Sequence, residues 1–114
     1  MNYKIIKATK DNIDQVGKLF DLYRQFYKYK SNIKESKNYI YERISNNEST
    51  IFLALINSNN PAGFVQLYET FGSLHLGKII ILYDLYVSIW FYVILCMMFF
   101  TCLTYVKTHF TNIL

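Results

Sequence analysis

Asp84 is the side chain with the clearest potential for chemistry, because it is the only charged residue between Lys78 and Lys107. It lies in a run of apolar and aromatic residues whose alternation predicts a strand with Asp84 on the same face as Leu82 and Tyr86. A carboxylate buried without partners is costly, so this one must be hydrogen-bonded, protonated or directed into a cleft. The sequence favours a structural hydrogen bond, with a cleft-facing carboxylate as the functional alternative.

Two further groups of side chains are candidates for lining such a cleft. Tyr23, Phe26 and Tyr27 recur at helical spacing, and Gln66 and Tyr68 share one face of a predicted strand. The spacing favours the helix core for Phe26, whereas the hydroxyls of Tyr23 and Tyr27 need hydrogen-bond partners and leave core and cleft equally open. Gln66 and Tyr68 are interpreted as polar members of a sheet surface, with contact to a substrate as the alternative.

Other kinds of site find no support in the sequence. Cys96 and Cys102 are flanked by Met and Phe without a basic neighbour that would activate a thiolate, so inert apolar packing is expected. His75 and His109 have no second ligand at metal spacing, so we expect no metal. No Ser-His-Asp grouping, phosphate-binding glycine loop or HExxH motif is present, which argues against hydrolases and kinases.

The composition describes one small folded domain. The 114 residues are 53% hydrophobic and 18% charged, which excludes whole-chain disorder, and the length accommodates a single core. The formal charge of +4 is spread among acidic residues at ordinary surface intervals, so no nucleic-acid partner is expected. The N-terminal residues lack the apolar stretch of a signal peptide, which favours a cytoplasmic location and reduced cysteines.

The composition changes abruptly near Val87 and divides the chain into a globular part, residues 1–87, and an apolar tail, residues 88–114. Periodicity, capping signals and turn residues predict the order β-α-α-β-β-β for the first part. The expected elements are a strand over Asn2 to Ala8, a helix from Asp11 to about Lys30, a helix from the cap Asn32 to Asn46, and strands over Thr50 to Ile56, Ala62 to Thr70 and Leu74 to Val87. The continuous apolar run Ile79 to Leu82 predicts a strand buried on both faces.

The tail begins with residues 88–106, which carry no charged side chain. A helix of this length spans about 28 Å, close to the thickness of a bilayer core, and Trp90 and Tyr105 lie near its ends as interfacial residues often do. A transmembrane helix is therefore one interpretation. A buried strand-like segment and an aggregation-prone product of a reading-frame change are the others.

Several phrases in the first part, taken in order, resemble the N-terminal half of the GCN5-related N-acetyltransferase (GNAT) superfamily. They are the opening IIKATKDNIDQV, LFDLYRQFY at Leu19 to Tyr27, GFVQLY at Gly63 to Tyr68 and IIILYDLYV at Ile79 to Val87. The resemblance covers residues 3–87. It implies an α+β fold, here a truncated GNAT-like β-α-α-β-β-β mixed sheet, followed by an unrelated apolar helix or strand.

The resemblance also implies an activity, the transfer of an acetyl group from acetyl-CoA to an amine. In the family the fourth strand offers backbone groups to the pantetheine arm, and Leu85, Tyr86 and Val87 match those positions. A carboxylate on this strand serves some members as a base, which assigns that role to Asp84. The same resemblance places Tyr23, Tyr27, Gln66 and Tyr68 on the acceptor side of the cleft.

The family pattern stops after Val87. Its diphosphate-binding loop needs glycine, because the backbone must approach the phosphates closely, yet no glycine follows Gly77. The helix and the fifth strand that should follow are also not recognisable. We therefore expect weak acetyl-CoA binding and little or no turnover. The alternative is a non-enzymatic, membrane-anchored protein with a vestigial GNAT-like domain in the cytoplasm.

Overall fold

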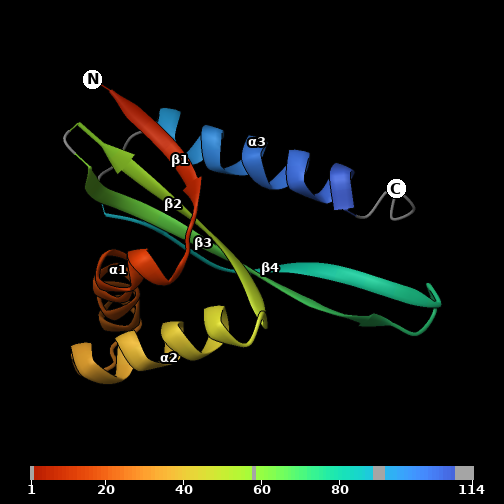
Figure 1. The fold of residues 1–114 in the computed structure, drawn as a ribbon, viewed down its shortest axis with the longest axis horizontal. Helices are drawn as coiled ribbons and strands as arrows, with labels where there is room; N and C mark the ends of the chain where they lie inside the picture. The colour runs from red at the N-terminus through yellow and green to blue at the C-terminus, as the bar shows by residue number, and fades with distance from the viewer. Residues whose placement is uncertain (1, 58, 89–91, 110–114) are drawn as a thin grey trace.

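The computed structural model describes residues 2–57, 59–88 and 92–109. In chain order its elements are β1 Tyr3–Lys7, the short 3-10 helix η1 Lys10–Asn12, α1 Ile13–Phe26, α2 Ile33–Ser45, β2 Ser49–Ile56, β3 Asn60–Gly72, β4 Gly77–Val87 and α3 Tyr92–His109. The strands form one four-stranded sheet in the order β1-β2-β3-β4, with α1 and α2 on one face and α3 on the other (Figure 1). The predicted α+β class and the order β-α-α-β-β-β are confirmed. All pairings among the described strands are antiparallel, so this part of the sheet is not mixed.

Local capping sets the ends of α1 and α2. Thr9 forms a capping box with Asn12 and starts η1, which leads directly into α1. The helix ends at Phe26, four residues before the predicted end, because Lys28 adopts a left-handed conformation with φ of 72°. Asn32 caps α2 as predicted, and its side-chain oxygen accepts a hydrogen bond from the Glu35 amide at 3.1 Å.

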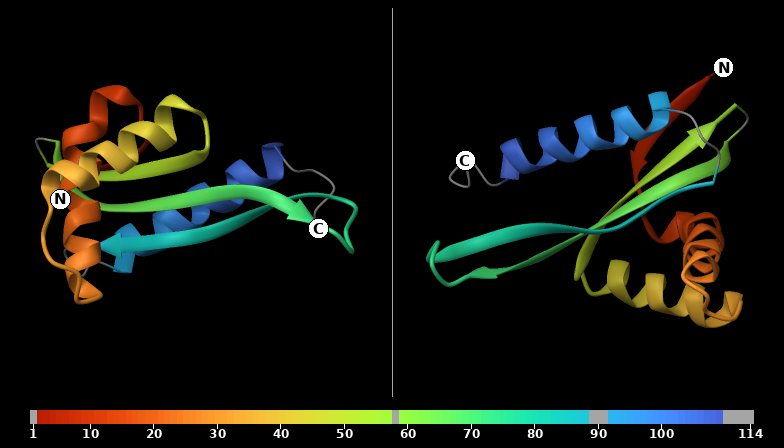
Figure 2. Two further views of the ribbon diagram at one scale, coloured as in Figure 1. Left: turned by 90° about the horizontal axis from the view of Figure 1, so that it is seen from below. Right: turned by 180° about the vertical axis from the view of Figure 1, so that it is seen from behind.

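The β3–β4 hairpin extends past the helices as a long arm (Figure 2). Its turn comprises residues 73–76, so β4 starts at Gly77 and not at Leu74. Leu74 and Leu76 are fully exposed in this turn. The prediction that Ile79 to Leu82 is buried on both faces is wrong, since β4 is the outermost of the described strands and this stretch lies on the arm. Its side chains are half-buried or exposed.

The sheet separates two hydrophobic clusters. The cluster beneath α1 and α2 includes Val16, Leu19, Ile40, Leu53 and Phe64. The cluster beneath α3 is made of Phe52, Ala54, Ile56, Ala62, Val65, Leu67, Ile94, Met98 and Cys102. Alternate side chains of β2 and β3 therefore supply both cores, as the period of two requires.

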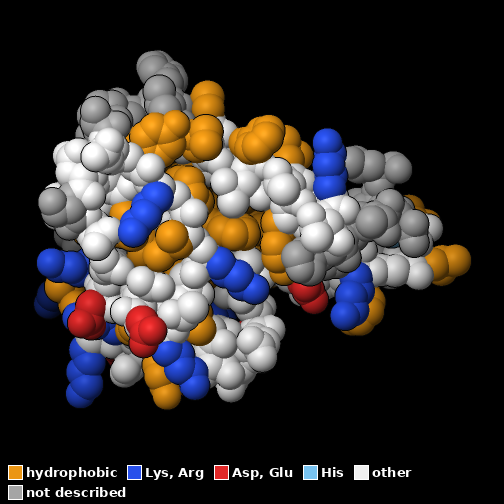
Figure 3. All heavy atoms as spheres, turned by 45° about the horizontal axis from the view of Figure 1, so that its top comes forward, with side chains coloured by type: hydrophobic (Ala, Val, Ile, Leu, Met, Phe, Trp, Pro, Cys, Tyr) orange, Lys and Arg blue, Asp and Glu red, His pale blue; other side chains and the backbone are white. Residues whose placement is uncertain are grey.

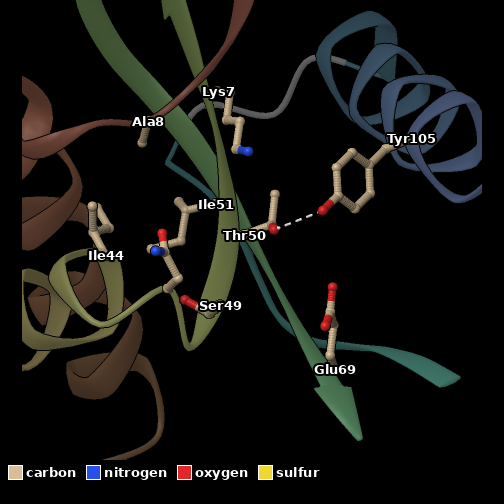
Figure 4. Close-up of a pocket in the computed structure, with 9 residues that line it drawn as sticks. Lys7, Ala8, Ile44, Ser49, Thr50, Ile51, Glu69 and Tyr105 are labelled. Atoms are coloured by element: carbon tan, nitrogen blue, oxygen red, sulfur yellow. Dashed lines mark hydrogen bonds between the residues drawn. The ribbon is translucent and has the colours of Figure 1, made fainter. Parts of the chain in front are cut away.

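The apolar tail is part of this fold, which corrects the expectation of an unrelated segment. Ile94, Met98 and Cys102 recur every four residues and form the buried side of α3. Nearer the end of the helix, Tyr105 bonds the Thr50 hydroxyl at 3.1 Å beside a pocket of about 200 Å³ (Figure 4). The tail from residue 92 to residue 109 is thus a helix docked on the sheet, and not a strand.

The outer side of α3 also carries apolar residues, which explains why the uncharged run suggested a membrane span. Phe99, Phe100 and Leu103 are exposed, and Figure 3 shows hydrophobic side chains gathered over the part of the molecule where α3 lies. None of the described helices has the combined length and hydropathy needed to cross a bilayer. The predicted span 88–106 also includes residues 89–91, which lie outside the described residues.

Candidate active site

A β-bulge in β4 determines the orientation of Asp84. Gln66 of β3 pairs with Asp84 and the next residue of β3 pairs with Leu82, so Tyr83 is an extra residue in the strand. Asp84 therefore lies on the same face as Tyr86, as predicted, but on the opposite face from Leu82. The bulge also lets the adjacent residues Tyr83 and Asp84 line one cavity on the α1/α2 side of the sheet.

Asp84 is buried and held by a short polar chain. The Gln66 amide nitrogen donates to Oδ2 of Asp84 at 2.8 Å, and the Ser49 hydroxyl donates to Oε1 of Gln66, also at 2.8 Å. The structural hydrogen bond expected for Asp84 is therefore present. The Tyr23 hydroxyl is a further hydrogen-bond partner of Asp84, and the carboxylate lines the cavity, where it is able to accept a proton from a bound molecule.

The cavity measures about 600 Å³ and lies between α1, α2 and the strands β3 and β4. This volume is typical of small-molecule sites. Its lining residues are Phe20, Tyr23, Arg24, Tyr27, Tyr29, Tyr39, Tyr68, Tyr83 and Asp84. Among these, Asp84 is the single carboxylate and aromatic rings predominate.

Two of the lining tyrosines have strongly perturbed hydroxyls. Burial, followed by the charge and hydrogen bonding of Asp84, raises the pKa of Tyr23 far above its usual value. Burial and the hydrogen bond with Tyr39 do the same for the pKa of Tyr68, and the two hydroxyl oxygens are 2.8 Å apart. Both hydroxyls therefore stay protonated at neutral pH and are able to donate hydrogen bonds. The guanidinium of Arg43 lies over the Tyr39 ring at 4.4 Å.

The structure brings most of the predicted acceptor-side residues together. Tyr23, Tyr27, Tyr68 and Asp84 all line the cavity. Gln66 is fully buried behind Asp84, with both ends of its amide engaged. Its predicted contact with substrate remains a prediction, and the structure places it where it orients the carboxylate.

One expectation for the helix is wrong, and several lining residues were not recognised. Phe26 is 69% exposed and does not belong to the core, because α1 ends at this residue. The unrecognised residues are Phe20, Arg24, Tyr29, Tyr39 and Tyr83. Phe20 and Arg24 left a signal in the sequence, since they lie at helical spacing from Tyr23 and Tyr27. Tyr39 left another, since it lies one helical turn before Arg43 and the two side chains stack.

The positions matched to the pantetheine-binding strand lie at the end of β4. Tyr86 faces the cavity side and its ring lies 6.2 Å from that of Tyr23, while Leu85 and Val87 pack toward α3. Because β4 is the last described strand, alternate residues direct N–H and C=O groups away from β3 with no described strand opposite them. This edge suits an extended chain with amide groups such as pantetheine. The sequence shows no glycine-containing diphosphate loop after Val87, and residues 89–91, where the family pattern would continue, lie outside the described residues.

Comparison with known proteins identifies relatives of the chain. No protein-family profile matches it. It is 36% identical over 83 residues to the uncharacterized N-acetyltransferase YhfO of Bacillus subtilis, covering 73% of this chain and 55% of the relative. It is 33% identical over 84 residues to a probable acetyltransferase of Haemophilus influenzae, covering 74% and 58%. The chain thus spans little more than half the length of these curated relatives.

Solved structures extend the similarity past β4. The crystal structure of a probable acetyltransferase superposes with a TM-score of 0.85 at 30% identity, covering 92% of this chain and 72% of that one. A predicted acetyltransferase from Clostridium acetobutylicum, solved with acetyl-CoA, has a TM-score of 0.74 at 15% identity and covers 94% and 75%. These matches include more of the chain than residues 1–87, so they include at least part of α3. The helix expected to follow the fourth strand is therefore present.

Proposed function

The chain belongs to the acetyltransferases of the GNAT superfamily, and we propose that it is an acetyl-CoA-dependent N-acetyltransferase that acts on an amine. The observation that carries this proposal is the position of Asp84. Its carboxylate lies at the wall of a small-molecule cavity, and the open edge of β4 begins beside it. An acceptor in the cavity and a thioester along the edge would meet near this residue.

Acetyl-CoA would supply the activated acetyl thioester. An amine would enter as its ammonium form and lose a proton to the Asp84 carboxylate, directly or through water, which frees the nitrogen lone pair. The amine nitrogen then attacks the thioester carbonyl carbon, a C–N bond forms, and the C–S bond breaks. The nitrogen would lose its second proton to the leaving thiolate, which gives the amide and the free thiol, and Asp84 would return its own proton to solvent. Most of the acceleration comes from holding the two reactants together.

The remaining predicted residues have positioning or binding roles in this proposal. The backbone of Leu85, Tyr86 and Val87 holds the pantetheine amides along the β4 edge. Tyr23, Tyr27 and Tyr68 form walls of the acceptor cavity. Each of these roles remains a proposal.

We expect the cofactor to bind weakly. No glycine follows Gly77, so the segment after β4 lacks the residue type that lets backbone amides approach a diphosphate closely. The N-terminus of α3 carries no acidic residue in its first turn and would still attract an anion, although one helix dipole is a small contribution. Low affinity and slow turnover follow for the chain as written.

A thermal-shift titration with acetyl-CoA tests the proposal. A ligand at ten times its dissociation constant stabilises the native state by about 1.4 kcal/mol, so a millimolar binder raises the melting temperature at 10 mM. Adenosine 3′,5′-bisphosphate serves as the control without the pantetheine arm. No shift with folded protein would contradict acetyl-CoA binding and favour a non-enzymatic module.

Acetyl transfer itself is measured by mass spectrometry of an amine mixture after long incubation. Slow transfer that disappears in Asp84→Asn supports the proposal. A turnover number in the ordinary enzymatic range of about 1 to 1000 per second would contradict the expected weakness. Fractionation of expressing cells tests the expected cytoplasmic location, which recovery of the protein with membranes would contradict.

A further inference from the structure

From the lining of the cavity we infer that the acceptor is a small primary amine with one positive charge and an apolar or aromatic body. This inference rests on the proposed function, because it names the substrate class of the same site. The juxtaposition that carries it is a single buried carboxylate, Asp84, among the rings of Tyr23, Tyr27, Tyr68 and Tyr83. A cation is attracted both by the carboxylate and by the electron-rich faces of the rings.

The rings are arranged as walls around an open space. Tyr23 meets Tyr27 edge to face with ring centroids 5.2 Å apart, and Tyr68 meets Tyr83 in the same way at 5.6 Å. The first pair belongs to the end of α1 and the second pair to β3 and β4. An organic body held between these walls gains apolar contact, while its ammonium group approaches the Asp84 carboxylate.

The surrounding charges argue against an acceptor with several amines. Arg24 lines the cavity and stacks on Tyr29 at 5.0 Å, and Arg43 stacks on Tyr39 at 4.4 Å. Within the described residues no carboxylate pairs with Arg24, so its charge is not neutralised locally. Arg43 is outside the lining and is paired with Glu42 and Glu48, so the relevant charge is that of Arg24. A second ammonium group would meet the Arg24 guanidinium and find no second carboxylate in the lining. The far end of the acceptor is therefore expected to be neutral or anionic.

Binding of defined probes in the absence of acetyl-CoA tests the inference by two-dimensional NMR on the full chain. The probes are 2-phenylethylamine, its neutral analogue 2-phenylethanol, the polyamine spermidine and a short uncharged-side-chain peptide with a free N-terminus. We expect 2-phenylethylamine to bind about tenfold more tightly than the alcohol, with shifts in the amides around Asp84. Spermidine and the peptide should bind more weakly than 2-phenylethylamine.

Two variants separate charge recognition from ring contact. Asp84→Asn should abolish the preference for the amine over the alcohol, whereas Asp14→Asn removes the same charge from an exposed site and should retain it. Tyr83→Leu should lower the affinity for 2-phenylethylamine and for 2-phenylethanol by about threefold each, because it removes one aromatic wall and leaves the carboxylate in place. Tyr83 is exposed enough for this change to leave the fold intact.

Equal affinity for the amine and the alcohol, or tighter binding of spermidine or the peptide, would overturn the inference. Retention of the amine preference in folded Asp84→Asn would do the same. The probe series on the unmodified chain decides the matter even when a variant fails to fold. Because these measurements need no acetyl-CoA, failure of the proposed transfer activity shows itself separately, as a missing acetyl-CoA shift beside intact amine binding.

Discussion

The two faces of the sheet differ in how they are held. Every buried polar or charged side chain among the described residues lies on the α1/α2 side, namely Asp21, Ser36, Gln66 and Asp84. The cluster beneath α3 is aliphatic, aromatic and sulfur-containing, with Thr50 and Tyr105 bonded at its margin. One face thus supplies hydrogen-bonded carboxylates and a cavity, and the other supplies packing. Strands β2 and β3 contribute side chains to both faces, so a destabilising substitution on one face should also weaken the packing of the other.

The largest expected effect comes from placing a charge in the α3 face. Ile94→Asp puts a carboxylate without partners at a fully buried position and should reduce the free energy of unfolding by more than about 4 kcal/mol. Chemical denaturation followed by circular dichroism measures the change. Phe100→Asp is the matched control, since Phe100 lies on the same helix and is exposed. Equal stability of the two variants would show that α3 is not docked as described.

On the other face, Asp21 is expected to be the most sensitive polar residue. Its carboxylate accepts hydrogen bonds from the Ser31 hydroxyl at 2.7 Å, the Asn32 amide at 2.7 Å, the Ser36 hydroxyl at 3.0 Å and the Gln25 amide at 2.9 Å. Asp21→Ala leaves these donors without their acceptor and should destabilise the protein by about 3 kcal/mol. Asp14→Ala, which truncates an exposed carboxylate of the same helix, should change the same denaturation midpoint little.

The same carboxylate should make the α1/α2 face sensitive to acid. Burial alone would raise the pKa of Asp21, but the hydrogen bonds from Ser31, Asn32, Ser36 and Gln25 outweigh it and lower the pKa below its ordinary 3.8. The stabilisation is therefore complete above the unfolded value and is lost as pH falls from about 4 through the folded value. The stability difference between the natural chain and Asp21→Asn should be constant above about pH 5 and shrink below pH 4.

A packing variant of the α3 face provides the contrast in this experiment. The stability difference between the natural chain and Met98→Ala should be independent of pH over the same range, because no titratable contact is removed. A difference for Asp21→Asn that stays constant down to pH 2 would contradict the assigned role of the Asp21 hydrogen bonds.

The sequence predicted the four strands and the helices α1 and α2 better than it predicted their ends. The Asn32 cap and the amphipathic pattern of α1 are local signals, and local signals are readable without tertiary structure. The left-handed residue Lys28 is not a glycine or asparagine, so nothing in the sequence marked the end of α1. The turn after β3 was predicted at Phe71 to Ser73 from Gly72, and it lies at residues 73–76 instead.

The geometry of the site and the position of the tail depend on contacts between distant segments, which a local sequence pattern does not reveal. The bulge at Tyr83 is defined by the pairing of β4 with β3, and the sequence of β4 alone does not reveal it. Strict alternation along β4 therefore assigned Asp84 to the face of Leu82, which is wrong. Both the buried and the exposed side of α3 carry apolar residues. The sequence of such a helix does not show whether a sheet or a lipid bilayer covers it. The aromatic spacing around Tyr23 left helix core and cleft equally open, and it was the family resemblance that indicated the acceptor side of the cleft.

A smaller effect is expected where β3 and β4 approach closely beside the predicted pantetheine edge. A Cβ at Gly63 would lie 2.8 Å from the Tyr86 carbonyl oxygen and 3.2 Å from the Val87 Cα, both of them backbone atoms. Gly63→Ala should therefore displace the end of β4 and cost about 1 to 2 kcal/mol. Hydrogen exchange should show the loss of protection concentrated at the end of β4, where the Ser88 amide donates to the Ala62 carbonyl oxygen. Gly77→Ala is the control, because its added methyl has only ordinary contacts, and equal losses in both variants would contradict this account.

The smallest perturbation uses the two thiols of α3 to report which side of the helix faces the sheet. Cys96 is exposed, whereas Cys102 is buried in the α3 cluster and burial raises the pKa of its thiol. Because the thiolate is the reactive form, an alkylating reagent at pH 8 should modify Cys96 rapidly and Cys102 only when the helix undocks. Mass spectrometry of the native protein should show one fast and one slow addition, with stability almost unchanged after the first. Adding the destabilising Ile94→Asp substitution should bring the two rates together, since it releases the buried side of α3. Equal rates in the natural chain would mean that the packing face of the sheet is not covered by this helix, and the contrast between the two faces would then fail.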